Sequence, residues 1–333
     1  MRKQLLKYLF LSALVLGLSA CTRQAAPEQA PEQAKTPEAP VQVGTLKGPT
    51  GMGMAKLMGD EMAKEEGKTF EFQVAGAPDE LVGKIVTGEI KIAALPTNLA
   101  ASLYNKTEGQ IQLVAVNTLG VLHLLEKGDT VHSLADIAGK HLHYSGQGSV
   151  PEYVLQHLLE LEGLGVEKDY TVDFSLQHEE LAAAMAAGEM DLAMLPQPHA
   201  TTALMKNPEL RVALDMNQAW EEATGTKLPM GCIVVDKAFS QEYPAVLEQF
   251  LQDYEASTDW VLANPEEAGI LIEALDILGS AAVAAAAIPQ SSIVYLDAGE
   301  AREDLEAFYR VLMDIQPKSI GGALPGDDFY HAD

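Results

Sequence analysis

Residues 80–100 have the sequence ELVGKIVTGEIKIAALPTNLA, and residues 180–200 have the sequence ELAAAMAAGEMDLAMLPQPHA. The two stretches share a Gly-Glu pair (at Gly88 and Gly188) and a Leu-Pro pair (at Pro96 and Pro196) at the same spacing. Each copy predicts an amphipathic helix that stops at the glycine, a short apolar strand, and a turn into another helix. Two such units indicate two similar α/β lobes, and a ligand held between the lobes would contact both Leu-Pro loops.

The N-terminus indicates export. Arg2, Lys3 and Lys7 precede an apolar run over 9–18, which is too short for a stable membrane span. Leu-Ser-Ala-Cys21 follows and is typical of a bacterial lipobox, which is cleaved before the cysteine. We therefore expect residues 1–20 to be a lipoprotein signal peptide. Cys21 would carry acyl chains, palmitate among them, and anchor the chain at the extracytoplasmic face of the cell membrane. The alternative is an ordinary secretory signal.

Residues 21–40 are dominated by Ala, Pro, Glu and Gln. Such a composition buries too little apolar surface to offset chain entropy, so this stretch predicts a disordered tether. From residue 41 onward the chain is long enough for two lobes rather than one core. Cys232 is the only other cysteine, which excludes an intrachain disulfide if Cys21 is acylated. We expect Cys232 to be a small core residue.

The chain is strongly acidic. It has a net charge of −26, and without its leader it keeps 19 basic against 48 acidic residues, a net charge of −29. This balance argues against a nucleic-acid partner. It does not identify a ligand, because many of the acidic residues fall on faces of predicted helices that solvent would cover.

Short apolar strands alternate with helices along the chain, which predicts an α/β fold with mixed, mainly parallel sheets. The first cycle covers residues 41–126, and a second cycle begins near residue 133. An apolar run over 230–235 predicts a return to the first lobe. We therefore assign residues 41–130 and 233–333 to lobe 1 and residues 131–232 to lobe 2. The chain would cross between them near 127–132 and 228–233.

In an open α/β sheet, ligands bind beyond the carboxyl ends of the strands, often at helix N-termini. Five polar loops follow predicted strands in this way, and we expect them to meet at one site. Side-chain amides, hydroxyls and backbone N–H groups in such loops grip a small polar molecule from several directions. The predicted ligand-binding residues are Gly48, Pro49, Thr50, Gly51, Thr97, Asn98, Asn117, Ser145, Gly146, Gln147, Gly148, Ser149, Gln197 and His199.

Each loop also has a purely structural interpretation. Gly48 and Gly51 fit a tight turn at a helix start, and Ser145, Ser149 and Asn98 fit helix caps. Tyr144 and Tyr153 fit core or rim positions as well as stacking platforms. The prediction of a site depends on all five loops lying at strand ends on one side.

The chain resembles a known family in the order of its motifs. These motifs are the lipobox, the Gly48-Pro-Thr-Gly51 loop, the helix at Asp79-Glu80 and the stretches 133–140 and 144–149. They are similar to solute-binding lipoproteins of ABC transporters, of the nitrate/sulfonate/taurine and thiamine-precursor type. The resemblance covers nearly all of residues 41–330. It implies a type II periplasmic-binding-protein fold with two hinge crossings. It also implies closure on a solute and delivery, as a monomer, to a permease and its ATPase.

The candidate loops contain few cations, so we expect a small polar organic solute and weak binding of simple inorganic anions. An alkanesulfonate, taurine or nitrate-type anion is the alternative, because helix N-termini hold anions without a cation. A metal-binding lipoprotein is another, since His141 and His143 lie two apart on one face of a predicted strand. Zinc needs three or four converging ligands, so we expect no metal. We expect no cofactor and no enzyme activity, because no catalytic motif is present, although related folds carry enzymes.

Overall fold

The computed structural model describes residues 35–332. The predicted signal peptide, Cys21 and most of the predicted tether lie outside these residues. The helices are α1 (Pro49–Met52), α2 (Ala55–Ala63), α3 (Asp79–Val86), α4 (Thr97–Lys106), α5 (Val150–Leu161), α6 (His178–Ala187), α7 (His199–Lys206), α8 (Met216–Thr224), α9 (Lys237–Glu242), α10 (Pro244–Ala263), α11 (Pro265–Ala274), α12 (Ala281–Ala287) and α13 (Ala298–Ile315).

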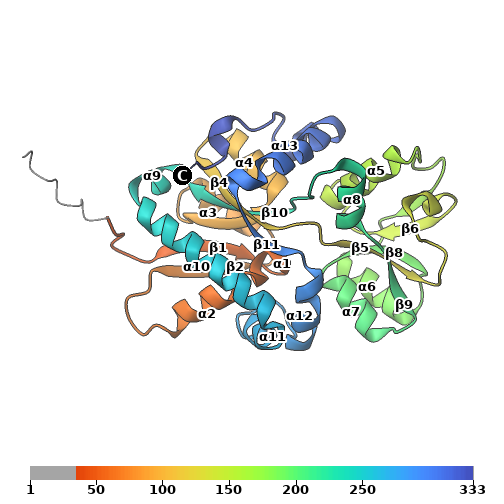
Figure 1. Cartoon of the computed structure of the whole chain (residues 1–333), viewed down its shortest axis with the longest axis horizontal. Helices are drawn as coiled ribbons and strands as arrows, with labels where there is room; N and C mark the ends of the chain where they lie inside the picture. Colours follow the sequence, from red (N-terminus) through yellow and green to blue (C-terminus); the bar gives the residue numbers. More distant parts are fainter. Residues whose placement is uncertain (1–34, 333) are drawn as a thin grey trace, which may run out of the picture. The chain divides into compact units, whose positions relative to one another are not determined.

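The strands form two mixed sheets, as the sequence predicts (Figure 1). The first sheet has the order β11-β4-β10-β3-β1-β2 and contains β1 (Val41–Leu46), β2 (Phe70–Ala75), β3 (Ile92–Pro96), β4 (Ile111–Thr118), β10 (Gly231–Asp236) and β11 (Ile293–Asp297). The second has the order β7-β6-β8-β5-β9 and contains β5 (Leu122–Lys127), β6 (His141–Tyr144), β7 (Thr171–Asp173), β8 (Leu192–Pro196) and β9 (Leu210–Asp215).

Strand direction within the sheets is more mixed than expected. Most strands of each sheet run the same way, but β10 lies antiparallel between β3 and β4, and β5 lies antiparallel between β8 and β9. Parallel neighbours remain at β1–β2, β1–β3, β6–β7 and β6–β8. β11 also runs antiparallel, at the edge of the first sheet beside β4. β10 and β5 are the strands by which the chain enters each sheet from the other.

The repeated units have the predicted structure. In both copies a helix (α3, α6) is followed by a central strand (β3, β8) and another helix (α4, α7). Gly88 and Gly188 have φ angles of 71° and 72°, a left-handed conformation that favours glycine. Their N–H groups donate to Ile85 and Met185 respectively, one turn back, which ends both helices in the same way. The shared Gly-Glu positions are therefore helix stops.

The first sheet is covered on both faces, so its central strands are apolar throughout. Along β3, Ile92 and Ala94 pack toward the cluster that includes residues of α2 and α10, and Ala93 and Leu95 pack toward the cluster that includes residues of α4 and α13. Figure 1 shows these helix pairs on opposite sides of the sheet. Cys232 is buried in β10, as expected, and burial raises the pKa of its thiol.

The first passage between the sheets lies earlier than predicted. We expected residues 41–130 to belong to lobe 1, whereas β5, within this range, pairs with β8 and β9 in the second sheet. The chain leaves β4 at Thr118 and enters β5 at Leu122. The apolar residues of β5 would pair equally well in either sheet. The connection from Thr118 to Leu122 is also short, as is typical of a link between two neighbouring strands of one sheet. The second passage runs from the end of α8 to Gly231, close to the predicted 228–233.

Neither β9 nor α8 was predicted from the sequence. β9 is an edge strand of the second sheet, and its mixed polarity hides the strand pattern. A signal for α8 was present, because the Asp215 carboxylate accepts hydrogen bonds from the N–H groups of Asn217 and Gln218 as an N-cap. Within α8, Trp220 is fully buried, and its ring lies 5.6 Å from that of Phe308 in α13. That contact joins a helix next to the second sheet to a helix on the first.

Candidate functional site

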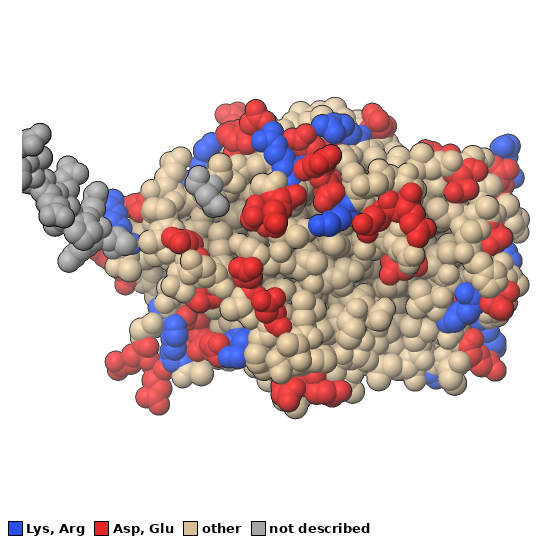
Figure 2. Space-filling model, in the orientation of Figure 1, with Lys and Arg blue, Asp and Glu red and all other residues tan. Residues whose placement is uncertain are grey.

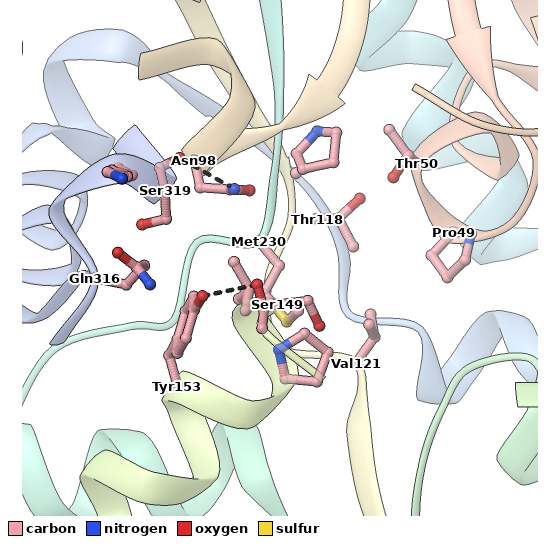
Figure 3. A pocket seen from close by; sticks show the side chains of 16 residues that line it. Pro49, Thr50, Asn98, Thr118, Val121, Ser149, Tyr153, Met230, Gln316 and Ser319 are labelled. Atoms are coloured by element: carbon pink, nitrogen blue, oxygen red, sulfur yellow. Dashed lines mark hydrogen bonds between the residues drawn. The ribbon is translucent and has the colours of Figure 1, made fainter. Parts of the chain in front are cut away.

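A cavity of about 580 Å³ opens where the ends of both sheets meet the two passages between them. Its lining comes from α1, the ends of β3 and β4, the start of β10, the starts of α4 and α5, and the segment after α13. The lining residues are Pro49, Thr50, Pro96, Asn98, Thr118, Val121, Gly148, Ser149, Val150, Pro151, Tyr153, Met230, Gly231, Gln316, Lys318 and Ser319. Figure 3 shows Pro49 and Thr50 facing Asn98, Ser319 and Gln316 across the open space, with Ser149 and Tyr153 entering from α5.

The Gly48-Pro-Thr-Gly51 loop places Pro49 and Thr50 at the cavity by holding the chain close to β1. Gly48 has a φ angle of 87°, which allows the sharp turn after the strand. A Cβ atom on Gly51 would lie 2.3 Å from the carbonyl oxygen of Leu46, so only glycine fits there. The amide of Asn117, at the end of β4, donates to the carbonyl of Thr50 at 3.2 Å. Gly48, Gly51 and Asn117 therefore support the lining without belonging to it.

The start of α4 is held between the return crossing and the C-terminal segment. Thr97 is buried, and its hydroxyl donates to the carbonyl of Pro229 at 2.7 Å. The next residue, Asn98, lines the cavity, and its amide lies 3.4 Å from the carbonyl of Ser319. The hydroxyl oxygen of Ser319 is itself buried and has no hydrogen-bond partner among the described residues. A buried, unpartnered hydroxyl at a cavity wall is suited to hydrogen bonding with a ligand.

The start of α5 brings the second sheet to the cavity. Ser149 is the N-cap residue and Pro151 lies in the first turn, as predicted. The Ser149 hydroxyl donates to the carbonyl of Gly146, and the Tyr153 hydroxyl donates to the carbonyl of Gly148 at 2.7 Å (Figure 3). Desolvation, with a contribution from the charge of Glu152, raises the pKa of Tyr153. The phenol stays protonated at neutral pH and remains a hydrogen-bond donor.

The other predicted residues of lobe 2 lie away from the cavity. Ser145 is buried and hydrogen-bonded to Nδ1 of His178, and Gln197 is buried and accepts from the Thr201 hydroxyl at 2.7 Å. His199 stacks on His178 with ring centroids 5.5 Å apart. Desolvation, reinforced by His199, lowers the pKa of His178 to about 4, so its imidazole is neutral at neutral pH. Gly146 and Gln147 are likewise absent from the lining. Ser145, Gln197 and the His178–His199 pair therefore pack the loops of the second sheet, whereas Gln147 is exposed.

Several lining residues were missed from the sequence. Four of them lie where the chain passes between the sheets: Thr118, Val121, Met230 and Gly231. They could be predicted as lining residues only if the positions of these passages were known. Gln316, Lys318 and Ser319 follow α13, far from the strand ends that guided the prediction. The C-terminal segment reaches the cavity by packing against α4.

The electrostatic character of the cavity is simple. Lys318 is the only charged residue among the lining residues, and none of them is acidic. Elsewhere acidic side chains are frequent, and on the face in Figure 2 they are spread among basic ones rather than gathered in one patch. Hydroxyl and amide groups of Thr50, Asn98, Ser149 and Ser319 surround the space, and Val121, Met230 and prolines supply apolar surface. The lining can hold a molecule with an acceptor-rich end and an apolar end.

Residues 53–286 match the model of a family described as ABC transporter, phosphonate, periplasmic substrate-binding protein. The chain belongs to this family. It is therefore a substrate-binding component of an ABC transporter, which confirms the family resemblance of the sequence and the predicted role. The family is described by its role in transport, and this description gives no indication of enzyme activity. Among residues 35–332, no helix combines the length and apolar character needed to cross a membrane.

Solved structures share the fold of this substrate-binding protein. An ABC transporter protein from Parabacteroides distasonis is 24% identical with a TM-score of 0.74, over 88% of this chain and 99% of that one. The periplasmic aliphatic sulphonate-binding protein SsuA from Escherichia coli is 17% identical with a TM-score of 0.66, over 86% and 91%. SsuA from Xanthomonas axonopodis pv. citri, bound to MOPS, is 16% identical with a TM-score of 0.60, over 88% and 96%. Among curated protein sequences, none matches this chain.

Proposed function

We propose that this substrate-binding protein captures a small organic solute with an acceptor-rich, acidic headgroup, such as an organophosphonate or an alkanesulfonate. The observation that carries the proposal is the single cation, Lys318, in a lining that has no carboxylate. The cavity volume of about 580 Å³ falls within the usual range for small-molecule sites. The proposal is narrower than the sequence-based expectation of a small polar organic solute, because it adds the charge of Lys318 to the polar loops.

The headgroup would lie near Lys318, Ser319 and Asn98, where a charged and two neutral donors converge. The first turns of α4 and α5 border the same space, and both helices are long enough for the positive ends of their dipoles to favour an anion. The apolar part of the solute would contact Val121 and Met230. A bare inorganic anion would leave that apolar surface exposed, so we still expect it to bind weakly.

The two sheets belong to two lobes. From the sequence we expected residues 41–130 and 233–333 to form lobe 1 and residues 131–232 to form lobe 2. We now set the first boundary near residue 121, because β5 pairs in the second sheet. Lining residues come from both lobes: Thr50 and Asn98 from the first, Ser149 and Tyr153 from the second. A solute that contacts all four favours the arrangement in which the lobes are close. The solute-loaded form would then dock, as a single chain, on a membrane permease that works with an ATPase.

Replacing Lys318 by Ala should weaken binding of an organic acid by about 10- to 100-fold, the value of a hydrogen bond to a charged group. The acid is first identified by mass spectrometry of solute released from the purified full-length chain, and is then titrated calorimetrically beside a phosphonate, a sulfonate, nitrate and sulfate. Small-angle scattering of the same loaded sample should show a smaller radius of gyration. Lys206→Ala, an exposed lysine at the end of α7, is the matched control.

Three results would contradict this proposal. Equal affinity of the Lys318→Ala protein and the parent would show that no anionic headgroup lies there. Micromolar affinity for nitrate or sulfate would show that the apolar surface contributes little. No compaction with a bound solute would exclude closure of the lobes.

We also propose that Cys21 is the lipidated N-terminus of the processed chain, because the preceding residues form a lipobox. Mass spectrometry of the membrane fraction should then find a diacylglyceryl-modified Cys21 peptide. The Cys21→Ser chain should move from the membrane fraction to the soluble fraction. Retention of the Cys21→Ser chain in the membrane, with a cleaved N-terminus, would show that another feature holds it there.

A further inference from the structure

His141, His143 and Asp173 lie together at the β7 edge of the second sheet. We infer that these three side chains form a binding site for a divalent transition-metal ion of the zinc type. None of the three lines the solute cavity, so the site is separate from the one proposed for the organic acid. The sequence had suggested two of the ligands and no third, and for that reason predicted no metal.

Strand pairing brings the third ligand into place. In the parallel pair of β6 and β7, His141 is opposite Thr171 and His143 is opposite Asp173. Residues two apart on a strand point to the same face, and so do residues opposite each other on neighbouring strands. Both histidines and Asp173 therefore project from one face, while Leu142 and Tyr144 project into the core on the other.

The donor atoms are close enough to share one ion. One ligand atom from each of the three residues lies within 4.8 Å of the other two. Tetrahedral zinc with bonds of about 2.0–2.1 Å needs its ligands about 3.3 Å apart. The two imidazole rings have centroids 4.8 Å apart at 89° to each other, so small side-chain rotations turn their nitrogens toward a common point.

The hydrogen bonds around the cluster leave its ligand atoms available. Nδ1 of His141 lies 2.7 Å from the hydroxyl of Thr171, which orients the ring and leaves Nε2 free. Such a bond to the second ring nitrogen is typical of metal-bound histidine. One carboxylate oxygen of Asp173 accepts from the N–H of Ser175 at 2.6 Å, and the Ser175 hydroxyl also bonds to this carboxylate, which orients it. The side chain of His143 makes no hydrogen bond within the described part of the chain, although it is half-buried.

Two imidazoles and one carboxylate select the class of ion. Calcium and magnesium prefer oxygen ligands, whereas imidazole suits zinc, copper, nickel and iron. Three protein ligands leave a fourth position for water, since His141 is exposed to solvent. The ion would tie the three-residue edge strand β7 to β6, and the strongly acidic chain attracts cations in general.

The experiment uses the full-length chain, freed of metal with a chelator and passed through gel filtration. Zinc is then added in a calorimetric titration, and cobalt is added separately because its visible spectrum reports nitrogen and oxygen coordination. We expect one zinc per chain at this site. Affinity should fall at least about tenfold in His143→Ala and in Asp173→Asn. Circular dichroism and melting of the metal-free variants check that they remain folded.

Two matched controls separate this site from other histidines. His132→Ala removes an exposed histidine that has a carboxylate, Asp129, at 3.5 Å but no third ligand, and should bind zinc as the parent does. His199→Ala removes one ring of the other histidine pair, with the same expectation. The inference is overturned if the parent binds no zinc, or if a folded His143→Ala protein keeps the parent's affinity. Loss of binding in His199→Ala alone would place the metal at the other pair.

Discussion

Replacing Gly51 by alanine should lower the free energy of unfolding by about 1–3 kcal/mol, as expected of a side chain forced into a filled space. The added Cβ atom would lie 2.3 Å from the Leu46 carbonyl oxygen and 3.3 Å from a methyl group of Ile277. The Leu46 carbonyl is part of the backbone of β1 and cannot move aside as a flexible side chain would, so α1 must shift to make room for the methyl group. Since α1 carries Pro49 and Thr50, solute affinity should fall as well. Urea unfolding and solute titration measure the two effects.

Gly83→Ala is the matched control for this substitution. Gly83 lies in the middle of α3, is exposed, and has no atom within 4 Å of an added Cβ. Alanine there should raise the free energy of unfolding by about 0.5–1 kcal/mol, because it restricts the unfolded chain and favours the helix. If both variants changed stability in the same direction, the close approach of α1 to β1 would not be the cause.

Replacing Trp220 by alanine should lower the free energy of unfolding by about 3–5 kcal/mol, as expected when a large buried aromatic ring is removed. Its ring is fully buried between those of His157, at 5.3 Å, and Phe308, at 5.6 Å, and its Nε1 donates to the Thr226 hydroxyl at 3.2 Å. Removing it opens a void where α5, α8 and α13 meet. The shift in urea midpoint, at an unchanged slope, measures the loss.

Trp260, the second tryptophan, provides the comparison. It is half-buried on α10, with Lys56 over its ring at 5.6 Å. Trp260→Ala should cost clearly less than Trp220→Ala, because water already reaches part of the ring and a smaller void is left. Equal costs for the two variants would mean that the contact between α8 and α13 contributes little to stability.

The repeat predicted local structure well because its signals are local. A glycine with positive φ ends a helix whatever surrounds it, and both copies follow this rule at Gly88 and Gly188. The short apolar run over 92–95 predicts a strand for the same reason. Local signals could not predict which sheet contains β5. Its apolar residues pair with β8 and β9, which come from distant parts of the chain.

Five of the predicted binding residues line the cavity: Pro49, Thr50, Asn98, Gly148 and Ser149. Each follows a strand and precedes or opens a helix, which is the pattern on which the prediction was based. Lys318 and Ser319 could not be predicted in this way, because they follow a long helix and reach the cavity only when α13 packs on the first sheet. The cavity therefore includes a cation that lies outside the loops on which the expected charge of the site was based.

The amino-acid sequence by itself determined the α/β character, the two repeated units, the acidic surface and the family to which the chain belongs. All of these depend on residues that are near in sequence or on the order of short motifs. Only the tertiary structure decided which sheet holds β5, that Lys318 is the one cation of the cavity, and that Asp173 stands beside His143. Each of those depends on a contact between residues far apart in the chain, and such contacts are set by packing and strand pairing rather than by local preference.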